Sequence, residues 1–160
     1  MDFAAALDPA SPVFWRHIGT AFLCGGAIGL ERQLSGKVSG IRTSILITLG
    51  TSFFVALGVS LSPPPLDPTR VLGQVVTGIG FLGAGVILSR GDRIIGVTTA
   101  SVIWVLAGLG SLIGAGRLQA AMVGTLLTLL VLVGVSGAEK RFARTAAKRG
   151  SGVFTTVSGE

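Results

Sequence analysis

Ionisable side chains are sparse in the apolar parts of this 160-residue chain, and those that could hold a charged ligand lie near segment ends. Glu31 and Arg32 close the first apolar segment, and Arg42 opens the second across a short loop. The favoured interpretation is an interfacial ion pair that orients the first two helices. The functional alternative, a cytoplasmic site for a ligand or partner, stays open.

Uncharged polar side chains form a second group of candidates. Gln74 and Thr77 lie within the third apolar segment, and Thr98 and Thr99 lie at the start of the fourth. Hydroxyl and carbonyl oxygens, together with water, can carry a cation through a membrane without any ionised residue. Hydrogen bonds between helices are the favoured explanation for the two threonines at the start of the fourth segment. A polar path along the third and fourth segments is therefore one of two functional hypotheses.

Several kinds of chemistry are disfavoured by what the sequence lacks. No Asp, Glu, Lys, Arg or His lies near the middle of an apolar segment, which counts against a proton relay. One acidic residue per loop is a poor basis for the oxygen ligands that Mg²⁺ prefers, so we predict no metal site, no cofactor and no enzyme. The letters GxGxxG at 78–83 match a dinucleotide motif, but they lie inside an apolar segment and no acid follows at the required distance.

The elements that must position these residues are membrane helices. Hydrophobic residues make up 49% of the chain, charged residues make up 12%, and the mean hydropathy is +0.78, which is typical of a membrane protein. The sequence predicts an all-α integral membrane protein, a compact bundle of five transmembrane helices in one domain over 13–138. The expected helices are 13–32, 43–61, 71–88, 94–113 and 118–138. A short extracytoplasmic lead, 1–12, precedes the domain, and a basic cytoplasmic tail, 139–160, with a disordered end follows it.

Basic residues predict the orientation of this bundle. With the N-terminus outside, ten of the 13 Lys and Arg residues lie on the cytoplasmic side: Arg32, Lys37, Arg42, Arg90, Arg93, Lys140, Arg141, Arg144, Lys148 and Arg149. Only Arg16, Arg70 and Arg117 lie outside. The positive-inside rule therefore predicts an N-out, C-in topology. Cytoplasmic loops also account for the net charge of +6, so no nucleic-acid partner is expected.

Glycine is concentrated in the third segment, Val71–Leu88, which contains Gly73, Gly78, Gly80, Gly83 and Gly85. On a helical wheel, a stripe of small residues stands opposite a stripe of bulky ones. We expect the bulky stripe to face lipid, the small stripe to face other helices, and this helix to be central. GxxxG pairs at Gly25/Gly29 and Gly110/Gly114 extend the prediction to a tight core of helices 1, 3 and 4. A homo-oligomer contact is the alternative use of these stripes.

Four motifs carry a resemblance to a known family. They begin at Gly25 (GGAIGLERQ), Gly40 (GIRT), Gly78 (GIGFLGAGV) and Gly96 (GVTTASVIW). In this order and spacing they resemble the MgtC/SapB family of bacterial inner-membrane proteins, from helix 1 to helix 5. The resemblance implies a multi-pass protein of the inner membrane that is linked to growth under magnesium limitation and to survival inside host macrophages.

The better-studied branch of that family is thought to restrain the F-type ATP synthase, and it is not regarded as a magnesium transporter. It carries a soluble C-terminal domain where this chain ends in a short tail, and Asn where this chain has Thr98, a position tied to virulence. Both departures place the chain nearer the short SapB-like members. The favoured hypothesis is a regulator that acts through contacts with a membrane protein. The alternative is a transporter or channel for magnesium or another small solute, lined by Gln74, Thr77, Thr98 and Thr99.

Overall fold

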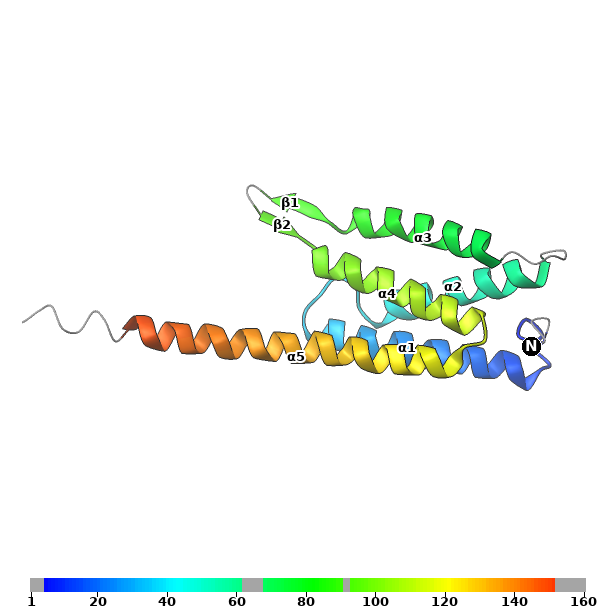
Figure 1. Ribbon diagram of the computed structural model, residues 1–160, viewed down its shortest axis with the longest axis horizontal. Helices are drawn as coiled ribbons and strands as arrows, with labels where there is room; N and C mark the ends of the chain where they lie inside the picture. Colours follow the sequence, from blue (N-terminus) through cyan, green and yellow to red (C-terminus); the bar gives the residue numbers. More distant parts are fainter. Residues whose placement is uncertain (1–4, 62–67, 91–92, 152–160) are drawn as a thin grey trace, which may run out of the picture.

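The computed structural model describes residues 5–61, 68–90 and 93–151, which form helices and one small hairpin (Figure 1). The helices are α1 (Pro12–Leu34), α2 (Ile41–Leu61), α3 (Pro68–Gly85), α4 (Val97–Gly114) and α5 (Leu118–Ser151). The antiparallel strands β1 (Leu88–Arg90) and β2 (Arg93–Ile95) pair Leu88 with Ile95 and Arg90 with Arg93. The mainly helical architecture that the sequence predicts is present. The proposed disorder at the end of the tail concerns residues 152–160, which lie outside the described ranges.

Four described helices are long and apolar enough to cross a membrane by length and composition. They are α1, α2, α4 and the Leu118–Val135 part of α5. Helix α3, with 18 residues, is not among them. A fifth span and the N-out orientation therefore remain predictions.

The ends of α1 follow from local sequence. Ser11 caps the helix, its Oγ accepting a hydrogen bond from the Val13 N–H at 3.2 Å, and Pro12 occupies the first turn. The described part of the lead, 5–11, forms turns, and Ala6 is buried. After α1, Gly36 has a φ of +67°, and the Lys37 N–H bonds to the Arg32 carbonyl at 2.9 Å. A left-handed residue at this point satisfies the last carbonyls of the helix.

The hairpin replaces the predicted end of helix 3 and the predicted start of helix 4. We expected helix up to residue 88 and again from 94, whereas α3 ends at Gly85 and α4 begins at Val97. The intervening Val86, Ile87, Ile94 and Ile95 are β-branched, and such residues favour strands. Gly96 then turns into α4 with a φ of +94°, and a Cβ there would collide with the Val86 carbonyl oxygen. Only glycine fits this turn.

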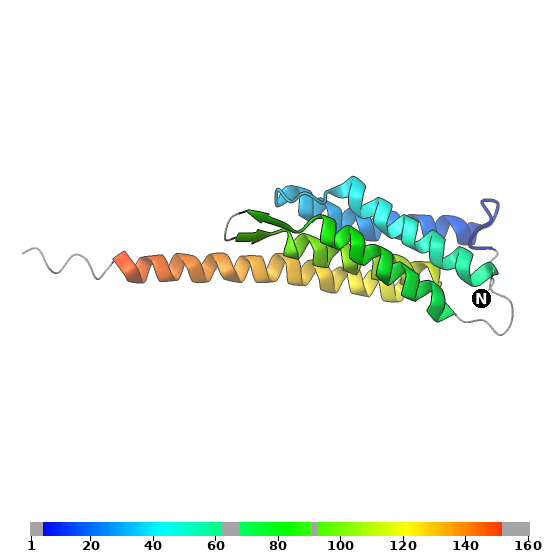
Figure 2. The ribbon, with the colours of Figure 1, turned by 90° about the horizontal axis from the view of Figure 1, so that it is seen from above.

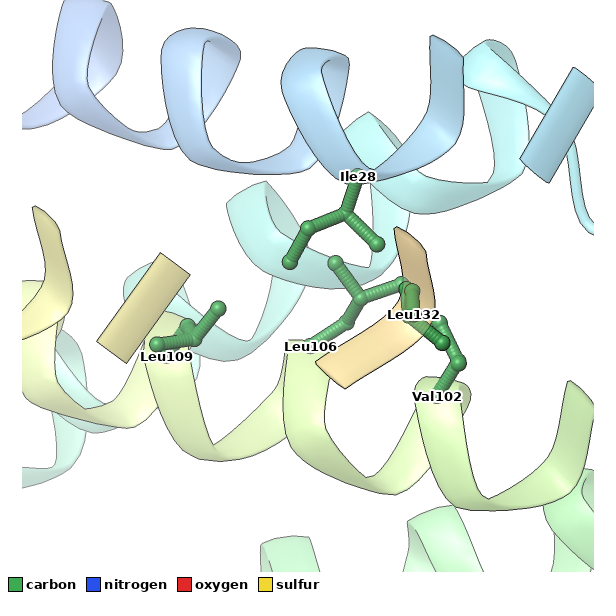
Figure 3. Packing of buried hydrophobic residues seen from close by; sticks show 5 residues of the cluster. All are labelled: Ile28, Val102, Leu106, Leu109 and Leu132. Carbon is green, nitrogen blue, oxygen red and sulfur yellow. The ribbon is translucent and has the colours of Figure 1, made fainter. Parts of the chain in front are cut away.

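The core lies between α1, α2, α4 and α5. Ile28 of α1 points toward Leu106 of α4, and Val102, Leu109 and Leu132 complete the largest buried cluster (Figure 3). Helix α5 lies beside α1 and α4 and continues past the hairpin as one helix to Ser151 (Figure 1). Seen from above, α3 crosses the view in front of α4, while α1 and α5, which contact each other, run along the two long sides of the view (Figure 2).

Glycine brings the backbones of α1, α2 and α4 together. A Cβ on Gly25 would lie 2.8 Å from the Ile45 Cα, and a Cβ on Gly29 would lie 2.6 Å from the Ile41 Cα. A Cβ on Gly114 would lie 2.9 Å from the Val55 Cβ. Side chains larger than hydrogen would therefore push α2 away from both neighbours. The tight core is made by α1, α2 and α4, in place of the predicted helices 1, 3 and 4.

Helix α3 is at the edge of the described bundle, which corrects the prediction that it is central (Figure 1). It packs on α2 and α4 through its bulky stripe, in which Ile79 is buried and Val75 and Val86 are half-buried. A Cβ at Gly73, Gly78, Gly80 or Gly85 would meet nothing within 4 Å. This part of the bulky stripe faces the bundle because its side chains fill the space against α2 and α4, whereas Leu72 and Leu82 of the same stripe are exposed. The small stripe faces outward, the reverse of our expectation.

Candidate functional site at the hairpin end

Most of the candidate residues meet at one end of the bundle, which we call the hairpin end. Here α1 ends, α2 begins, α3 ends and α4 begins, next to the β1–β2 hairpin (Figure 1). The candidate residues come together because they flank two connections, from α1 to α2 and from α3 to α4, and both connections lie at this end of the bundle. These two connections contain Lys37 and Gly96.

Glu31 and Arg32 form an ion pair, but both residues belong to α1, so the expected role of the pair in orienting the first two helices stays a prediction. The Arg32 Nε donates to Glu31 Oε2 at 2.5 Å and its Nη2 donates to Oε1 at 2.8 Å, while Ser35 Oγ also donates to Oε1 at 2.8 Å. The Arg32 side chain is 3% exposed and that of Glu31 is 13% exposed. A guanidinium buried to this degree needs its carboxylate, because an unpaired charge is very unfavourable away from water.

Three buried polar atoms near this pair lack a hydrogen-bond partner among the described residues. They are Arg32 Nη1, Ser39 Oγ and Ser44 Oγ. Ser39 and Ser44 were missed in the sequence, where each reads as an ordinary loop or helix serine. For Ser44 the available signal was Gly29, whose absent side chain leaves room for it, since a Cβ at Gly29 would lie 3.0 Å from Ser44 Oγ. Arg42 is exposed at the start of α2, and no ion pair to it is found within the described ranges.

A pocket of about 340 Å³ with a mixed polar and apolar lining includes Thr98 and Thr99 of α4. Thr98 is exposed and Thr99 is buried, and Lys37 and Val38 approach them from the α1–α2 connection. Ile94, Ile95 and Gly96 close the pocket from the hairpin side. Lys37, which the sequence analysis did not single out as a site residue, is the charged residue of this lining. The pocket can accept a small polar group near the start of α4.

Gln74 and Thr77 lie elsewhere, so the four polar candidates do not form one strip. Gln74 lines a separate apolar groove between α2 and α3. Thr77 is exposed on α3, and its hydroxyl donates to the Gly73 carbonyl of the same helix at 2.9 Å. The structure brings Thr98 and Thr99 together with Lys37, and it keeps both threonines apart from Gln74.

Hydroxyls inside the bundle bond mainly to their own helices. Thr48 donates to the Ser44 carbonyl at 2.9 Å, Thr51 to that of Ile47 at 2.5 Å, and Thr125 to that of Ala121 at 2.8 Å. Such bonds satisfy a buried hydroxyl locally and leave few free donors to line a water path. The described interior is thus mainly aliphatic residues, glycines and threonines bonded to their own helices, and it also buries His17, Arg32 and Ser44.

The outside of the molecule is apolar over most of its helices. Leu46, Phe54, Phe81 and Leu130 are each at least 60% exposed, and Trp15 is also exposed. An exposed apolar surface of this extent on helices of membrane-crossing length requires a lipid environment. Fold and surface together define an integral membrane protein.

Comparison with known proteins identifies the family. The model of the MgtC family matches residues 18–141, and the chain belongs to that family. It is 47% identical over 124 residues to "Putative magnesium transporter YhiD" of Escherichia coli K12, covering 73% of this chain and 57% of that protein. It is 44% identical to "Protein MgtC" of Brucella abortus 2308, covering 69% and 46%, and 38% identical to "Protein MgtC" of Salmonella typhimurium 14028s, covering 76% and 52%. The chain thus spans about half the length of these curated relatives, and no solved structure matched it.

Proposed function

We propose that this chain is a multi-pass protein of the bacterial inner membrane that takes part in adaptation to magnesium limitation by contacting another membrane protein. The proposal includes the N-out, C-in topology and α3 as a fifth span. One observation carries it: the outward small stripe of α3, which we define as Gly73, Thr77, Gly80 and Ala84. All four residues are exposed in the described structure.

A stripe of small residues is a means of close helix approach in a membrane. Helices in lipid gain little from the hydrophobic effect, so van der Waals contact between closely spaced backbones drives their association. Gly25 and Gly29 of α1 and Gly110 and Gly114 of α4 are already used in this way against α2. The stripe of α3 has the same composition and no covering helix within the described chain. It therefore fits a helix of another protein.

The link to magnesium rests on the relatives. The name of the Escherichia coli protein connects it with magnesium, and the MgtC family resemblance implies a role in growth when magnesium is scarce. The F-type ATP synthase is the membrane complex that the resemblance suggests as a partner. A second copy of this chain is the other occupant that the stripe would suit.

The described interior supports a contact role over a magnesium pathway. The Thr48 and Thr125 hydroxyls bond to their own helices, and no group of three or more His, Cys, Asp or Glu residues that could hold a metal occurs within the described ranges. Mg²⁺ keeps close to octahedral oxygen coordination and gives up its water reluctantly. A packed apolar core has few oxygen ligands that could replace this water.

Partner capture in native membranes tests the proposal. Gly80→Leu would fill the stripe without disturbing the fold, because nothing lies within 4 Å of a Cβ there. Gly108→Leu is the matched control, since Gly108 of α4 is also exposed and unobstructed. After chemical crosslinking and purification, we expect the wild type and Gly108→Leu to retain one membrane partner and Gly80→Leu to lose it. Equal recovery from all three proteins would contradict the proposal.

Two further measurements separate regulation from transport. In liposomes loaded with a magnesium indicator, we expect no flux through the wild type above that of empty liposomes. Flux that Gln74→Leu/Thr98→Val abolishes would establish the transporter instead. In cells lacking the gene, we expect poor growth in low magnesium to be restored by the wild type and by Gly108→Leu, and not by Gly80→Leu.

A further inference from the structure

A groove between α2 and α3 holds about 650 Å³ and is open to one side of the bundle. Each helix contributes six residues at spacings of three and four, from Thr43 to Phe54 on α2 and from Val71 to Leu82 on α3. Residues at such spacings share one helix face. Leu46, Phe54 and Leu82 are all more than half exposed, so the groove opens where the bilayer surrounds the protein. Its lining is almost wholly apolar.

The size of the groove indicates what it can hold. The stretch from Thr43 to Phe54 rises about 17 Å at 1.5 Å per residue. A volume of 650 Å³ over that length corresponds to a mean cross-section of about 40 Å². The groove is therefore long and wide enough for an unbranched hydrocarbon chain.

A positive charge at one end of the groove indicates which lipid headgroup would accompany the hydrocarbon chain. Thr43 lines the groove at the hairpin end, and Arg42 precedes it as an exposed cation. No ion pair to Arg42 occurs in the part of the chain that the structure describes. In the topology proposed above, this end meets the cytoplasmic leaflet, where anionic phospholipids are found.

We infer that the α2–α3 groove binds an acyl chain of an anionic phospholipid, whose phosphate lies against Arg42. The chain would contact Gly50 from one side and Gly78 from the other, where no protein atom comes within 4 Å of a Cβ. Lipid would thus complete the packing of α3, which protein side chains leave unfinished on this side. This inference concerns a different face of α3 from the small stripe and does not depend on the partner contact.

Native mass spectrometry of the purified full chain tests the inference. Detergent-solubilised protein is titrated with phosphatidylglycerol, which is anionic, or with phosphatidylcholine, which has no net charge. We expect the wild type to retain one phosphatidylglycerol and to prefer it over phosphatidylcholine. Arg42→Gln should reduce that preference about fivefold, the factor expected for one basic residue at an anionic surface.

Two glycines two positions apart give the decisive comparison. Gly78→Leu would place a side chain inside the groove, whereas Gly80→Leu would place one outside it, and both sites are unobstructed. We expect Gly78→Leu and, from the opposite wall, Gly50→Leu to lose the retained lipid while Gly80→Leu keeps it. Equal lipid retention by Gly78→Leu and Gly80→Leu would overturn the inference. The inference would also be overturned if the wild type formed a lipid-free dimer and Gly78→Leu dissociated that dimer. The occupant of the groove would then be a second copy of the protein.

The same pair keeps this inference separate from the proposed function. Gly80→Leu should abolish partner capture and leave lipid retention unchanged. Loss of lipid retention in Gly78→Leu with normal partner capture supports the lipid site alone. Thermal unfolding of each variant in detergent shows whether it is folded, and a folded Gly78→Leu protein that still binds lipid as the wild type does would count against the inference.

Discussion

Gly110 and Gly114 of α4 and Gly73 and Gly80 of α3 lie in similar apolar helices and have opposite surroundings. A Cβ on Gly110 would collide with the Thr51 side chain and lie 2.5 Å from the Thr48 carbonyl oxygen. A Cβ on Gly73 or Gly80 of α3 would meet nothing within 4 Å. At Gly110 of α4 glycine is required for contact within the chain, whereas at Gly73 and Gly80 of α3 it leaves a surface that other molecules can approach.

The difference comes from the facing helix. Helix α2 presents buried small polar residues, Ser44, Thr48, Thr51 and Ser52, to the glycines of α1 and α4. Their short side chains allow backbone contact, and their hydroxyls reach back to carbonyls of α2 in three of the four cases. Helix α3 meets α2 and α4 through Val75, Ile79 and Val86 instead. A groove lies beside these bulky contacts, between α2 and α3.

The largest expected loss of stability comes from placing a large residue at Gly110, where α4 contacts α2 closely. Gly110→Leu requires α2 and α4 to separate, because the first side-chain atom already overlaps the backbone and side chains of α2. We expect loss of the monodisperse protein peak in fluorescence-detected size-exclusion chromatography. Gly108→Leu, two residues away on the exposed face, should give the wild-type profile. A normal Gly110→Leu profile would show that the α2–α4 contact is looser than described.

A somewhat smaller effect is expected at the buried ion pair. Glu31→Ala leaves the Arg32 guanidinium without its carboxylate in a site where the side chain is 3% exposed. Removing one member of a buried pair is destabilising by about 3 kcal/mol or more. The free energy of unfolding, measured by denaturing detergent titration, should fall accordingly. Glu31→Ala/Arg32→Met should recover most of it, because the charge and its partner are then both absent.

An equal loss in the double variant would contradict this account. It would mean that Glu31 acts through Ser35, to which it is also hydrogen-bonded at 2.8 Å, and that the guanidinium does not need it. Arg42→Ala is the exposed control at the same end of the bundle. It should change the free energy of unfolding by no more than about 0.5 kcal/mol.

The sequence was sufficient for the class of fold, since hydropathy and length alone indicate apolar helices with short connections. It did not reveal which helix is central. The wheel of α3 separates small from bulky residues correctly, but which stripe meets the bundle depends on the surface that α2 and α4 offer. That surface is set by residues such as Ile47 of α2 and Ile103 of α4, which lie outside α3 in the sequence.

The hairpin and the site show the same limit. Val86, Ile87, Ile94 and Ile95 are apolar and extend the hydropathy of the neighbouring helices, so a membrane-length criterion includes them. Their β-branching was a local signal for the strands. In the sequence-based prediction, the length of the apolar segments was given more weight than this signal. The Glu31–Arg32 pair was predictable from adjacent opposite charges, whereas Lys37 reaches Thr98 and Thr99 only because two connections meet in space.

A moderate loss of stability is expected when one methyl group is added at Gly29, where α1 contacts α2 closely. Gly29→Ala would place its Cβ 2.6 Å from the Ile41 Cα and 2.9 Å from the Ser44 Cβ, so α1 and α2 must move apart. Overpacking of this kind is destabilising by about 1–3 kcal/mol. Thermal unfolding in detergent should show a lower midpoint. An unchanged midpoint would indicate that the α1–α2 turn adjusts without strain.

The smallest change in stability is expected when the same methyl group is added at Gly80, on the exposed stripe of α3. This change has the opposite sign, because it stabilises the protein. Gly80→Ala meets no atom within 4 Å and replaces glycine inside a helix, which favours the folded state by up to about 1 kcal/mol. The unfolding midpoint of the purified protein should therefore rise slightly, as it should for Gly108→Ala. If the α3 stripe is a contact face, the two variants must diverge once the partner is present. Gly80→Ala should then weaken crosslinking in membranes although it stabilises the isolated chain, and Gly108→Ala should not. Stabilisation without any change in crosslinking would place the partner contact on another helix.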